Sequence, residues 1–390
     1  MPVFAFWLSD ILKKQYFSVF ILLILGVSNS IVFAVQNFIV KLDAVAAINK
    51  SHSQYLMNVL ITGAAGYLGS IVLKKMQEDL NAGTVKTLVC TDLRELAADK
   101  RLKSVIYEQA DIRDGERMKE ICLKYRPQVI LHLAAVLDSQ SMPREIQYQI
   151  DVEGTKKLLD AALESGCKRI IISSSGAAYG YYADNPEWLR ESDPVRGNKI
   201  FAYSDHKRLV EEILAEYRAK HPQLEQTIFR IGTILGAKTD NLITALFKKK
   251  RILGLKGFKS PFVFIWDEDA AACLRQAIFS DKSGIYNLVG DGALANKDLA
   301  QLLGKPYREM HPGFLRIMLS ILQPLGLSKY GPEQLLFLQY RPVLDNTKLK
   351  EVFGFKPVKT SLDTFCFYLK SIGIEPRNIS KINVLRNNVF

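Results

Sequence analysis

The chain contains 390 residues, of which 48% are hydrophobic and 24% charged, which is ordinary for a folded protein with a sizeable core, and its length suggests one large domain plus a smaller one. Of the net charge of +12, +10 lies in residues 241–390, which hold 22 lysines and arginines against 12 aspartates and glutamates. The excess favours an anionic ligand or surface, but no helix-turn-helix, RNA-binding or zinc-finger pattern accompanies it, so nucleic acid is not an expected partner. The densest basic cluster, residues 248–251 with Lys256 and Lys259 beyond it, is interpreted as a solvated helix end, with contact to phosphates or lipid headgroups as the alternative.

The cysteines are odd in number and widely spaced, and they form neither a C-x-x-C pair nor a cluster with histidine. They are Cys90, Cys122, Cys167, Cys273 and Cys366. This pattern predicts no metal site and a reduced, cytoplasmic environment.

An apolar extension over residues 1–56 precedes the first predicted strand. Residues 16–40 carry no charge and are long enough to cross a hydrocarbon core of ~30 Å as a helix. However, the polar residues 28–30 lie near the centre of this segment, and the placement of Lys13 and Lys14 opposes a simple anchor for a cytoplasmic domain. Three interpretations stay open: a dispensable extension from an upstream start, since Met57 directly precedes the strand; a membrane-associated helix; and, least favoured, a signal peptide.

From residue 58 onward, short apolar runs alternate with amphipathic stretches. The runs that predict strands are residues 59–62, 87–90, 128–135 and 169–175. The stretches that predict helices are residues 69–80, 115–125, 152–165 and 203–217. Buried runs separated by crossover helices indicate a parallel sheet, so the predicted fold is α/β, a Rossmann-type doubly wound parallel sheet.

After Gly232, glycines and prolines break the chain into short pieces, which predicts a smaller C-terminal substrate-binding domain. The predicted parts are the extension over 1–56, a Rossmann domain with the catalytic residues over 57–235, a mainly substrate-side subdomain with segments returning to the Rossmann core over 236–370, and a basic tail over 371–390. The apolar residues 313–324 are interpreted as core, with an apolar pocket wall or a membrane-facing lid as the alternative.

The first strand is followed directly by GAAGYLG at residues 63–69, with glycines three apart at a strand-to-helix turn. In such a turn the first glycine allows a tight bend, the second lets the backbone approach a pyrophosphate, and the third lets helix and sheet pack closely. The N-terminus of the following helix offers free N–H groups to the phosphates. Gly63, Gly66 and Gly69 therefore predict a dinucleotide site.

Asp92 ends the second predicted strand, 23 residues after Gly69, close to the ~20-residue spacing expected for a carboxylate that binds the adenosine ribose. A carboxylate there repels a 2′-phosphate, so NAD is the predicted cofactor. Arg94 lies two residues further on and keeps NADP as a less favoured alternative.

Further motifs follow in a fixed order: Asp111-Ile112, HLAA at 132–135, DVEGT at 151–155, SSSGAAYG at 173–180 and YSDHK at 203–207. Together with the glycine turn, they resemble the extended short-chain dehydrogenase/reductases, the NAD-dependent epimerase/dehydratase family, over roughly residues 57–365. The resemblance implies catalytic roles for Ser175, Tyr203 and Lys207. It implies cofactor-binding roles for Gly63, Gly66, Tyr67, Leu68, Gly69, Asp92, Asp111, Ile112, Leu133, Ala134, Ala135, Tyr203 and Lys207.

The spacing of Tyr203 and Lys207 suits proton transfer. Residues at i and i+4 of a helix share a face, and a nearby ammonium stabilises a tyrosine phenolate. Tyr203 can then take a proton from a substrate alcohol or return it to a ketone, while Ser175, at the end of a strand, hydrogen-bonds the substrate oxygen. His206, between them, faces another side of the helix and is interpreted as structural.

Departures from the family's motifs bear on the substrate. Gly176-Ala177 stand where the sugar 4,6-dehydratases of the family have an Asp-Glu pair, so dehydration is not expected. In UDP-sugar epimerases an asparagine contacts the substrate and an arginine binds its diphosphate. This sequence has Thr233 at the position of that asparagine and Phe262 at the position of that arginine, which disfavours a nucleotide-sugar substrate. Asp151 likewise replaces the family's usual asparagine and leaves the hydrogen bonding of that helix start open.

The residues expected at the substrate are Ser175, Thr233, Phe262 and Arg341, with Arg341 or Lys259 as a substitute for the missing arginine. The sequence therefore predicts an NAD-dependent oxidoreductase that acts on a secondary alcohol or ketone, with a UDP-sugar epimerase as the alternative and a non-catalytic NAD-binding redox sensor as the lesser one. The expected partner is a small-molecule substrate. Membrane association through residues 16–40 and a homodimer are compatible with the sequence.

Overall fold

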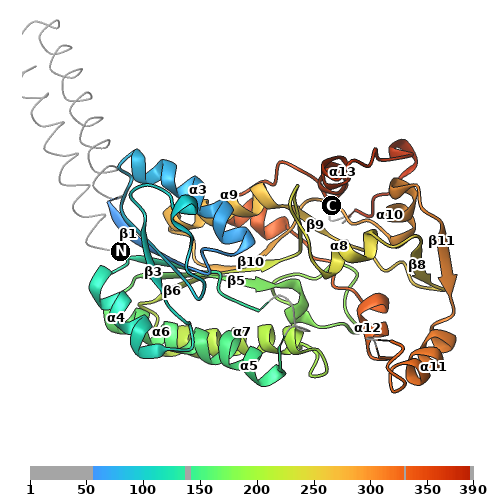
Figure 1. Ribbon diagram of the computed structural model, residues 1–390, viewed down its shortest axis with the longest axis horizontal. Coiled ribbons are helices and arrows are strands. Elements are labelled where there is room, and N and C mark those ends of the chain that lie inside the picture. The colour runs from blue at the N-terminus through green and yellow to red at the C-terminus, as the bar shows by residue number, and fades with distance from the viewer. Residues whose placement is uncertain (1–55, 137–141, 329–330, 387–390) are drawn as a thin grey trace, which may run out of the picture. The chain divides into compact units, whose positions relative to one another are not determined.

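Within the residues described by the computed structural model, which are 56–136, 142–328 and 331–386, seven parallel strands form the central sheet (Figure 1). Their order is β10-β6-β5-β4-β1-β2-β3, and each neighbouring pair is parallel. The strands are β1 Met57–Thr62, β2 Val85–Asp92, β3 Ile106–Gln109, β4 Val129–His132, β5 Arg169–Ser175, β6 Glu225–Ile231 and β10 Gly284–Leu288. The order runs outward in both directions from β1, which is the doubly wound arrangement.

Helices cover both faces of this sheet (Figure 1). The helices are α3 Tyr67–Asn81 and α9 Asp267–Phe279 on one face, and α4 Gly115–Tyr125, α5 Arg144–Tyr148, α6 Gly154–Ser165 and α7 Ala202–Lys220 on the other. Each face has its own apolar core, in which side chains of alternate strand positions pack against the helices. This architecture confirms the predicted Rossmann-type α/β fold.

Short one-turn elements connect or extend these helices. They are η1 Ala98–Lys100, η2 Gln149–Glu153, η3 Gly176–Tyr179, η4 Leu349–Phe353 and η5 Ile379–Lys381. Of these, η2 and η4 are π-helical. A π-helical turn widens the helix locally, and η2 lies where the chain approaches the active-site region, between α5 and α6.

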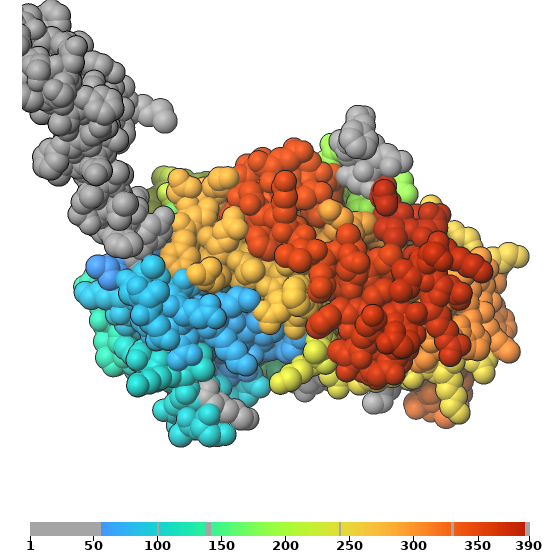
Figure 2. All heavy atoms as spheres, turned by 90° about the horizontal axis from the view of Figure 1, so that it is seen from above, coloured from blue at the N-terminus to red at the C-terminus, as the bar shows by residue number. Residues whose placement is uncertain are grey.

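A second group of elements forms the smaller part of the molecule, at the right of Figure 1. Its elements are β7 Thr233–Leu235, α8 Leu242–Phe247, β8 Ile252–Leu255, β9 Phe264–Trp266, α10 Asn296–Leu303, β11 Tyr307–Met310, α11 Pro312–Leu322, α12 Gln334–Gln339 and α13 Ser361–Ser371. The rings of Phe262, Phe264 and Phe365 stack in its core, with centroids 5.7 and 5.5 Å apart. Figure 2 shows the red C-terminal residues beside the orange ones in this part, and the blue residues that follow β1 at the opposite end.

The chain returns from this part to the central sheet. Helix α9 packs against the sheet, and β10 extends it beyond β6, although both elements follow β7, β8 and β9 in the sequence. The carboxyl end of β6 therefore lies next to the beginning of the smaller part, where β7 follows it.

The apolar residues 313–324 were interpreted as core, and that interpretation is wrong. Most of them lie in α11, where only Leu315 is buried, while Phe314, Ile317 and Ile321 are more than half exposed. Helix α11 packs through one narrow edge against β8 and α12. Its broad apolar face has no neighbour within the part of the chain that the structure describes.

The apolar segment over residues 16–40 lies outside the described residues. Among the residues that are described, no helix is both long and apolar enough to cross a bilayer.

We expect residues 57–390, expressed without the preceding 56, to fold as they do in the full chain and to bind NAD, the cofactor that the sequence predicts. The reason is that every strand of the central sheet and each of its apolar cores comes from residues after 56. Calorimetric titration of both proteins with NAD, together with circular dichroism, checks this. Aggregation of the shortened chain, with NAD binding kept by the full chain in detergent, would show that the first 56 residues are required.

Candidate active site

A cavity of about 810 Å³ opens at the carboxyl ends of the central strands, where ligands bind in doubly wound sheets. Its walls come from the ends of β1, β2, β4, β5 and β6 and from the N-terminal part of α7. Segments of the smaller part close the other side, among them β7, the residues before and within α8, and α12. The cavity therefore joins the two parts of the fold.

The glycine turn after β1 leaves no room for side chains. Gly63 has a φ of +70°, and a Cβ atom there would lie 2.6 Å from the Ala134 nitrogen. A Cβ at Gly69 would lie 2.3 Å from the Gly63 carbonyl oxygen, and one at Gly66 would lie 3.1 Å from the same oxygen. Gly66 caps α3 without a side-chain hydrogen bond, so the first N–H groups of the helix are left for a ligand. This cradle fits a dinucleotide pyrophosphate.

Asp92 lies at the end of β2 on the wall of the same cavity. One carboxylate oxygen accepts a hydrogen bond from the Ala65 N–H at 3.0 Å, and the other accepts one from the Arg94 N–H at 3.0 Å. These bonds fix the negative charge beside the glycine turn. The Arg94 side chain is largely exposed.

Asp111 and Ile112 line the cavity after β3. The Arg113 guanidinium donates hydrogen bonds to both carboxylate oxygens of Asp111 and holds the pKa of that carboxyl below its ordinary value. Ile112 packs closely against Gly154, where a Cβ would lie 2.9 Å from the isoleucine side chain. Ile112 thus fixes the loop against the start of α6.

The loop after β4 contributes Leu133, Ala134 and Ala135 to the cavity wall. Beneath it, His132 is buried, and its ring nitrogens lie 2.7 Å from the Thr62 hydroxyl and 3.1 Å from the Thr155 hydroxyl. Burial, reinforced by the Lys207 ammonium, lowers the pKa of His132 to about 3, so the ring is neutral at physiological pH.

Asp151 has a defined partner in the structure, although its sequence position left this open. Its buried carboxylate accepts a hydrogen bond from the Val136 N–H at 2.9 Å and lies 3.5 Å from Nδ1 of His206. The His206 ring also meets Tyr148 edge-on. Asp151 therefore ties the loop after β4 to the helices behind it.

Ser175, Tyr203 and Lys207 all line the cavity. Ser175 ends β5, and its hydroxyl accepts a hydrogen bond from the Ala177 N–H at 3.1 Å. Lys207 is buried, donates to the Ser173 carbonyl oxygen at 2.9 Å, and holds its ammonium 5.8 Å from the centre of the Tyr203 ring. Tyr203 is half-buried at the start of α7. A hydroxyl, a phenol and an ammonium thus face one space beside the glycine turn.

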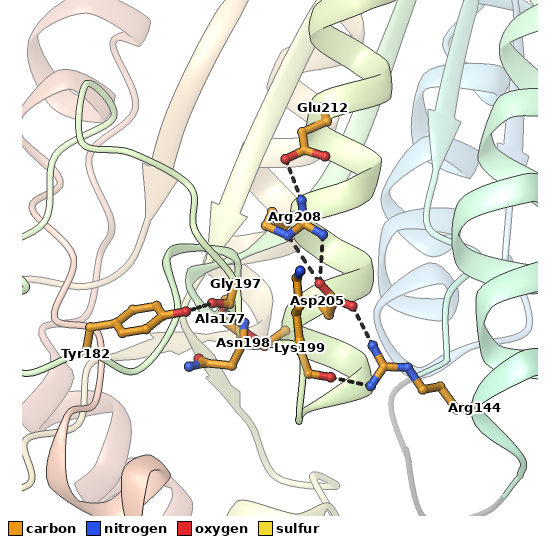
Figure 3. Close-up of polar contacts among 10 residues, drawn as sticks. Arg144, Ala177, Tyr182, Gly197, Asn198, Lys199, Asp205, Arg208 and Glu212 are labelled. Atoms are coloured by element: carbon orange, nitrogen blue, oxygen red, sulfur yellow. Dashed lines mark hydrogen bonds and ion pairs between the residues drawn. The ribbon is translucent and has the colours of Figure 1, made fainter.

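Charged residues hold the first turns of α7 in place (Figure 3). Arg208 donates to Asp205 at 2.8 Å and to Glu212 at 2.5 Å on the same helix. Arg144, from α5, binds both Asp205 and the Lys199 carbonyl oxygen in the loop before α7 (Figure 3). The start of the helix that carries Tyr203 is therefore clamped from the side of α5.

A second set of bonds ties this helix to the segment after β5. The Ser204 hydroxyl donates to the Ala177 carbonyl oxygen at 2.6 Å and accepts from the Asn198 N–H at 3.0 Å. Tyr182 donates to the Gly197 carbonyl oxygen at 2.6 Å (Figure 3). Because Ala177 follows Ser175 by two residues, these bonds fix the distance between the serine segment and Tyr203.

Tyr67, next to the glycine turn, is hydrogen-bonded to α9 and to the segment between β7 and α8. The Tyr67 hydroxyl donates to Asp267 at 2.5 Å and accepts from Thr239 at 3.0 Å. Burial raises the pKa values of both Tyr67 and Asp267. Thr233 begins β7 and lines the cavity. The glycine turn is thereby braced across the cavity against the start of α9.

Phe262 and Arg341 lie together behind the cavity wall. The Arg341 guanidinium is stacked between the rings of Phe262 and Phe337, 3.6 and 4.0 Å from their centres. Its Nε and one terminal nitrogen are buried without a hydrogen-bond partner in the described structure. Burial lowers the pKa of Arg341 to about 10, so the group stays charged at neutral pH. Phe262 is a core residue, whereas Phe337 reaches the cavity.

All predicted catalytic and cofactor residues, together with Thr233, thus lie on one cavity, while Phe262 and Arg341 do not line it. Sequence reasoning missed Tyr181, Lys238 and Phe337, which do. Tyr181 follows the serine motif directly and could have been included by its position. Lys238 and Phe337 lie in segments without a motif, and only the folded chain brings them to the site.

A family model for the NAD dependent epimerase/dehydratase family matches residues 59–288. An uncharacterized protein of Mycobacterium tuberculosis is 22% identical over 329 residues, which cover 83% of this chain and 86% of that protein. A UDP-glucose 4-epimerase of Yersinia enterocolitica is 29% identical over 193 residues, 48% of this chain and 56% of the epimerase.

Solved structures share the fold. A UDP-glucose 4-epimerase of Thermotoga maritima with UDP-glucose aligns with a TM-score of 0.62 at 19% identity, over 81% of this chain and 99% of that one. A dTDP-glucose 4,6-dehydratase of Bacillus anthracis in complex with NAD aligns with a TM-score of 0.61 at 18% identity, over 81% and 96%. The family match extends over more than half of the chain and includes the glycine turn, the serine segment and the Tyr203–Lys207 helix. The chain belongs to the NAD dependent epimerase/dehydratase family.

Proposed function

We propose that the protein catalyses NAD-dependent hydride transfer at a secondary alcohol or ketone carbon, with Tyr203 as the acid/base. The observation that carries the proposal is the convergence of Ser175, Tyr203 and Lys207 on the cavity that also contains the glycine turn and Asp92. The glycine turn, Asp92, Asp111 and the loop after β4 would hold NAD, as would Lys207. Bound NAD supplies the hydride acceptor.

Residues of the chain would transfer the proton between the substrate and Tyr203. Ser175 hydrogen-bonds the substrate oxygen and orients it toward Tyr203. Tyr203 takes the hydroxyl proton as the carbonyl forms and returns it in the reverse direction. The Lys207 ammonium is fixed by the Ser173 carbonyl and stabilises the negative charge that develops on Tyr203. His132 is neutral and adds no competing charge.

We further propose that residues 57–235 carry the cofactor and the catalytic groups, and that residues 236–370 mainly bind substrate. In support, residues 238–241, Ile243, Phe337, Pro342 and Leu344 of this region form part of the cavity wall. Much of this wall is apolar, which suits a substrate with an apolar body.

A UDP-sugar epimerase remains the second candidate, and Arg341 is the observation that favours it. A buried guanidinium without a hydrogen-bond partner in the described structure is costly unless a ligand supplies an anion. Its neighbours Phe337 and Pro342 line the cavity, so a phosphate could reach it through a modest shift of side chains. The relatives named UDP-glucose 4-epimerases point the same way.

Incubation of the full chain with NAD and a panel of sterols, other hydroxy compounds and UDP-sugars separates the two candidates. A dehydrogenase accumulates NADH in proportion to oxidised product, whereas an epimerase inverts a sugar carbon with no net NADH. We expect NADH with a hydroxy compound, and no formation by Tyr203→Phe. Inversion of a UDP-sugar without net NADH would replace the first candidate by the second.

We expect NAD to bind at least ~10 times more tightly than NADP, a difference of ~1.4 kcal/mol. The fixed Asp92 carboxylate repels a 2′-phosphate, and Asp92→Asn, which keeps the shape of the side chain, should reduce the preference. Calorimetric titration of both proteins with both cofactors measures this. Equal or reversed affinities of the unaltered protein would contradict the assignment of Asp92.

A further inference from the structure

Helix α11 and the turn after it expose a continuous series of large apolar side chains. Phe314, Ile317 and Ile321 are 61, 63 and 56% exposed, and Leu325 and Leu327 in the following turn are 64 and 72% exposed. Residues 314, 317 and 321 are spaced at three and four, so they share one face of the helix. An exposed apolar patch of this kind marks an interaction surface.

The opposite edge of the same helix is firmly packed. Leu315 is 4% exposed and lies in one apolar cluster with Leu255 of β8 and Leu335 of α12. The His311 ring caps the helix by accepting from the Gly313 N–H. The exposed face is therefore presented by a helix that the fold holds in place.

Basic side chains lie on α11 and on the segments next to it. Lys256, Lys259, Arg308 and Arg316 are exposed, and within the described ranges none of them forms an ion pair. The Lys256 N–H binds the Met310 carbonyl oxygen just before α11 begins, and Ser260, next to Lys259, donates to the Leu338 carbonyl oxygen of α12. Arg316 lies on α11 itself. Glu309 and Glu333 are the acidic residues in these neighbouring segments. The four basic residues, which we call the basic rim, therefore outnumber the acidic ones.

We propose that α11 and residues 323–327 dock into the interface of a lipid bilayer that contains anionic lipids. An apolar helix face enters the boundary between headgroups and acyl chains, and a basic rim binds the anionic headgroups. A second copy of the chain would bring two positive rims together, which disfavours self-association through this face.

Docking by this face would place the substrate side of the cavity near the lipid. Helix α12 packs on α11 through Leu335, and Phe337 of α12 lines the cavity two residues further on. The docking itself does not depend on which reaction the cavity catalyses, and its test requires no substrate.

The test uses the full chain with one cysteine introduced at Ile317 and labelled with an environment-sensitive fluorophore. A matched control carries the label at Val358, which is 77% exposed and directly precedes Lys359, whose N–H donates to Asp269 of α9. The existing cysteines are buried except for half-buried Cys366, and the unsubstituted chain measures background labelling. The probe is a set of vesicles of phosphatidylcholine with or without phosphatidylglycerol, and brominated acyl chains serve as contact quenchers.

With phosphatidylglycerol vesicles, we expect the label at position 317 to shift to the blue and to be quenched by brominated lipid, while the label at 358 does neither. Because quenching requires contact, this reports on α11 even if another segment of the chain also binds the vesicle. Lys256→Gln and Arg316→Gln should each weaken vesicle binding about fivefold.

Other outcomes overturn the proposal. A label at 317 that is already blue-shifted without vesicles and is insensitive to dilution would show that the chain's own residues cover the face. A shift that depends on protein concentration would indicate a second copy. A shift induced by an added acidic protein but not by vesicles would indicate a protein partner, and no change with vesicles would exclude lipid docking.

Discussion

Replacement of Tyr203 by phenylalanine is expected to lower turnover by ~10²-fold or more and to leave NAD affinity nearly unchanged. The change removes one oxygen atom, and with it the hydroxyl that we propose exchanges a proton with the substrate. The ring that packs beside Lys207 remains, and Lys207 keeps its hydrogen bond to the Ser173 carbonyl oxygen. Turnover at saturating NAD and calorimetric NAD binding, measured on the same preparations, check both halves of the expectation.

Two further variants give this measurement its controls. Tyr182→Phe removes a hydroxyl from a neighbouring loop that binds the Gly197 carbonyl oxygen and does not line the cavity, so turnover should change only a few-fold. Lys207→Ala should weaken both NAD binding and turnover, because in the proposed mechanism Lys207 binds the cofactor and stabilises the phenolate. Near-equal turnover of Tyr203→Phe and the unaltered protein would show that Tyr203 is not the acid/base.

The inner strands of the sheet could be predicted because they are apolar and follow one another with regular crossovers. Strands β1, β2, β4 and β5 are buried at most positions, so their sequences show unbroken apolar runs. The edge strand β3 is half-exposed and reads IYEQ, without such a run. Its place depends on pairing with β2, which is a tertiary contact.

Strand β10 could not be positioned for a different reason. It pairs with β6, yet more than fifty residues and several elements of the smaller part separate the two in sequence. No local sequence pattern indicates that the chain returns to the central sheet after the elements of the smaller part. Likewise, the apolar run predicted over 128–135 ends as a strand at His132, because the chain then turns to form the cavity wall.

The candidate site likewise contains residues that the sequence could place and residues that it could not. The glycine turn, Asp92, Ser175 and the Tyr203–Lys207 pair lie at ends of regular elements, where spacing in the sequence determines position in space. The Arg341 stack pairs Arg341 and nearby Phe337 with Phe262, which is almost eighty positions away in the sequence, and no local pattern brings Phe262 to the other two. The exposed face of α11 could not be predicted either, because its apolar sequence is equally compatible with a buried helix.

Replacement of Arg230 by methionine is expected to lower the free energy of unfolding by ~3–5 kcal/mol, since it leaves a buried carboxylate without its counter-charge. Arg230 on β6 and Glu211 on α7 have side chains only 4 and 5% exposed, and they are joined by hydrogen bonds of 2.6 and 3.0 Å. Glu211 also accepts from the Ser174 hydroxyl at 2.5 Å, and Arg230 donates to the Tyr179 hydroxyl at 2.8 Å. The pair thus connects α7, one turn beyond Lys207, to the strand that ends in Ser175.

A second change should relieve part of this loss. In the double variant Arg230→Met with Glu211→Gln neither position of the pair carries a charge, so urea denaturation followed by circular dichroism should find it more stable than Arg230→Met alone. Glu225→Gln provides the matched control, because it breaks an arginine–glutamate pair between the neighbouring strands whose glutamate is 47% exposed, and it should cost at most ~1 kcal/mol. If Arg230→Met were no more costly than Glu225→Gln, and the double variant no more stable than the single one, the pair would not be the desolvated brace described above. In that case the orientation of α7 would depend mainly on the Arg144–Asp205 clamp at its first turn.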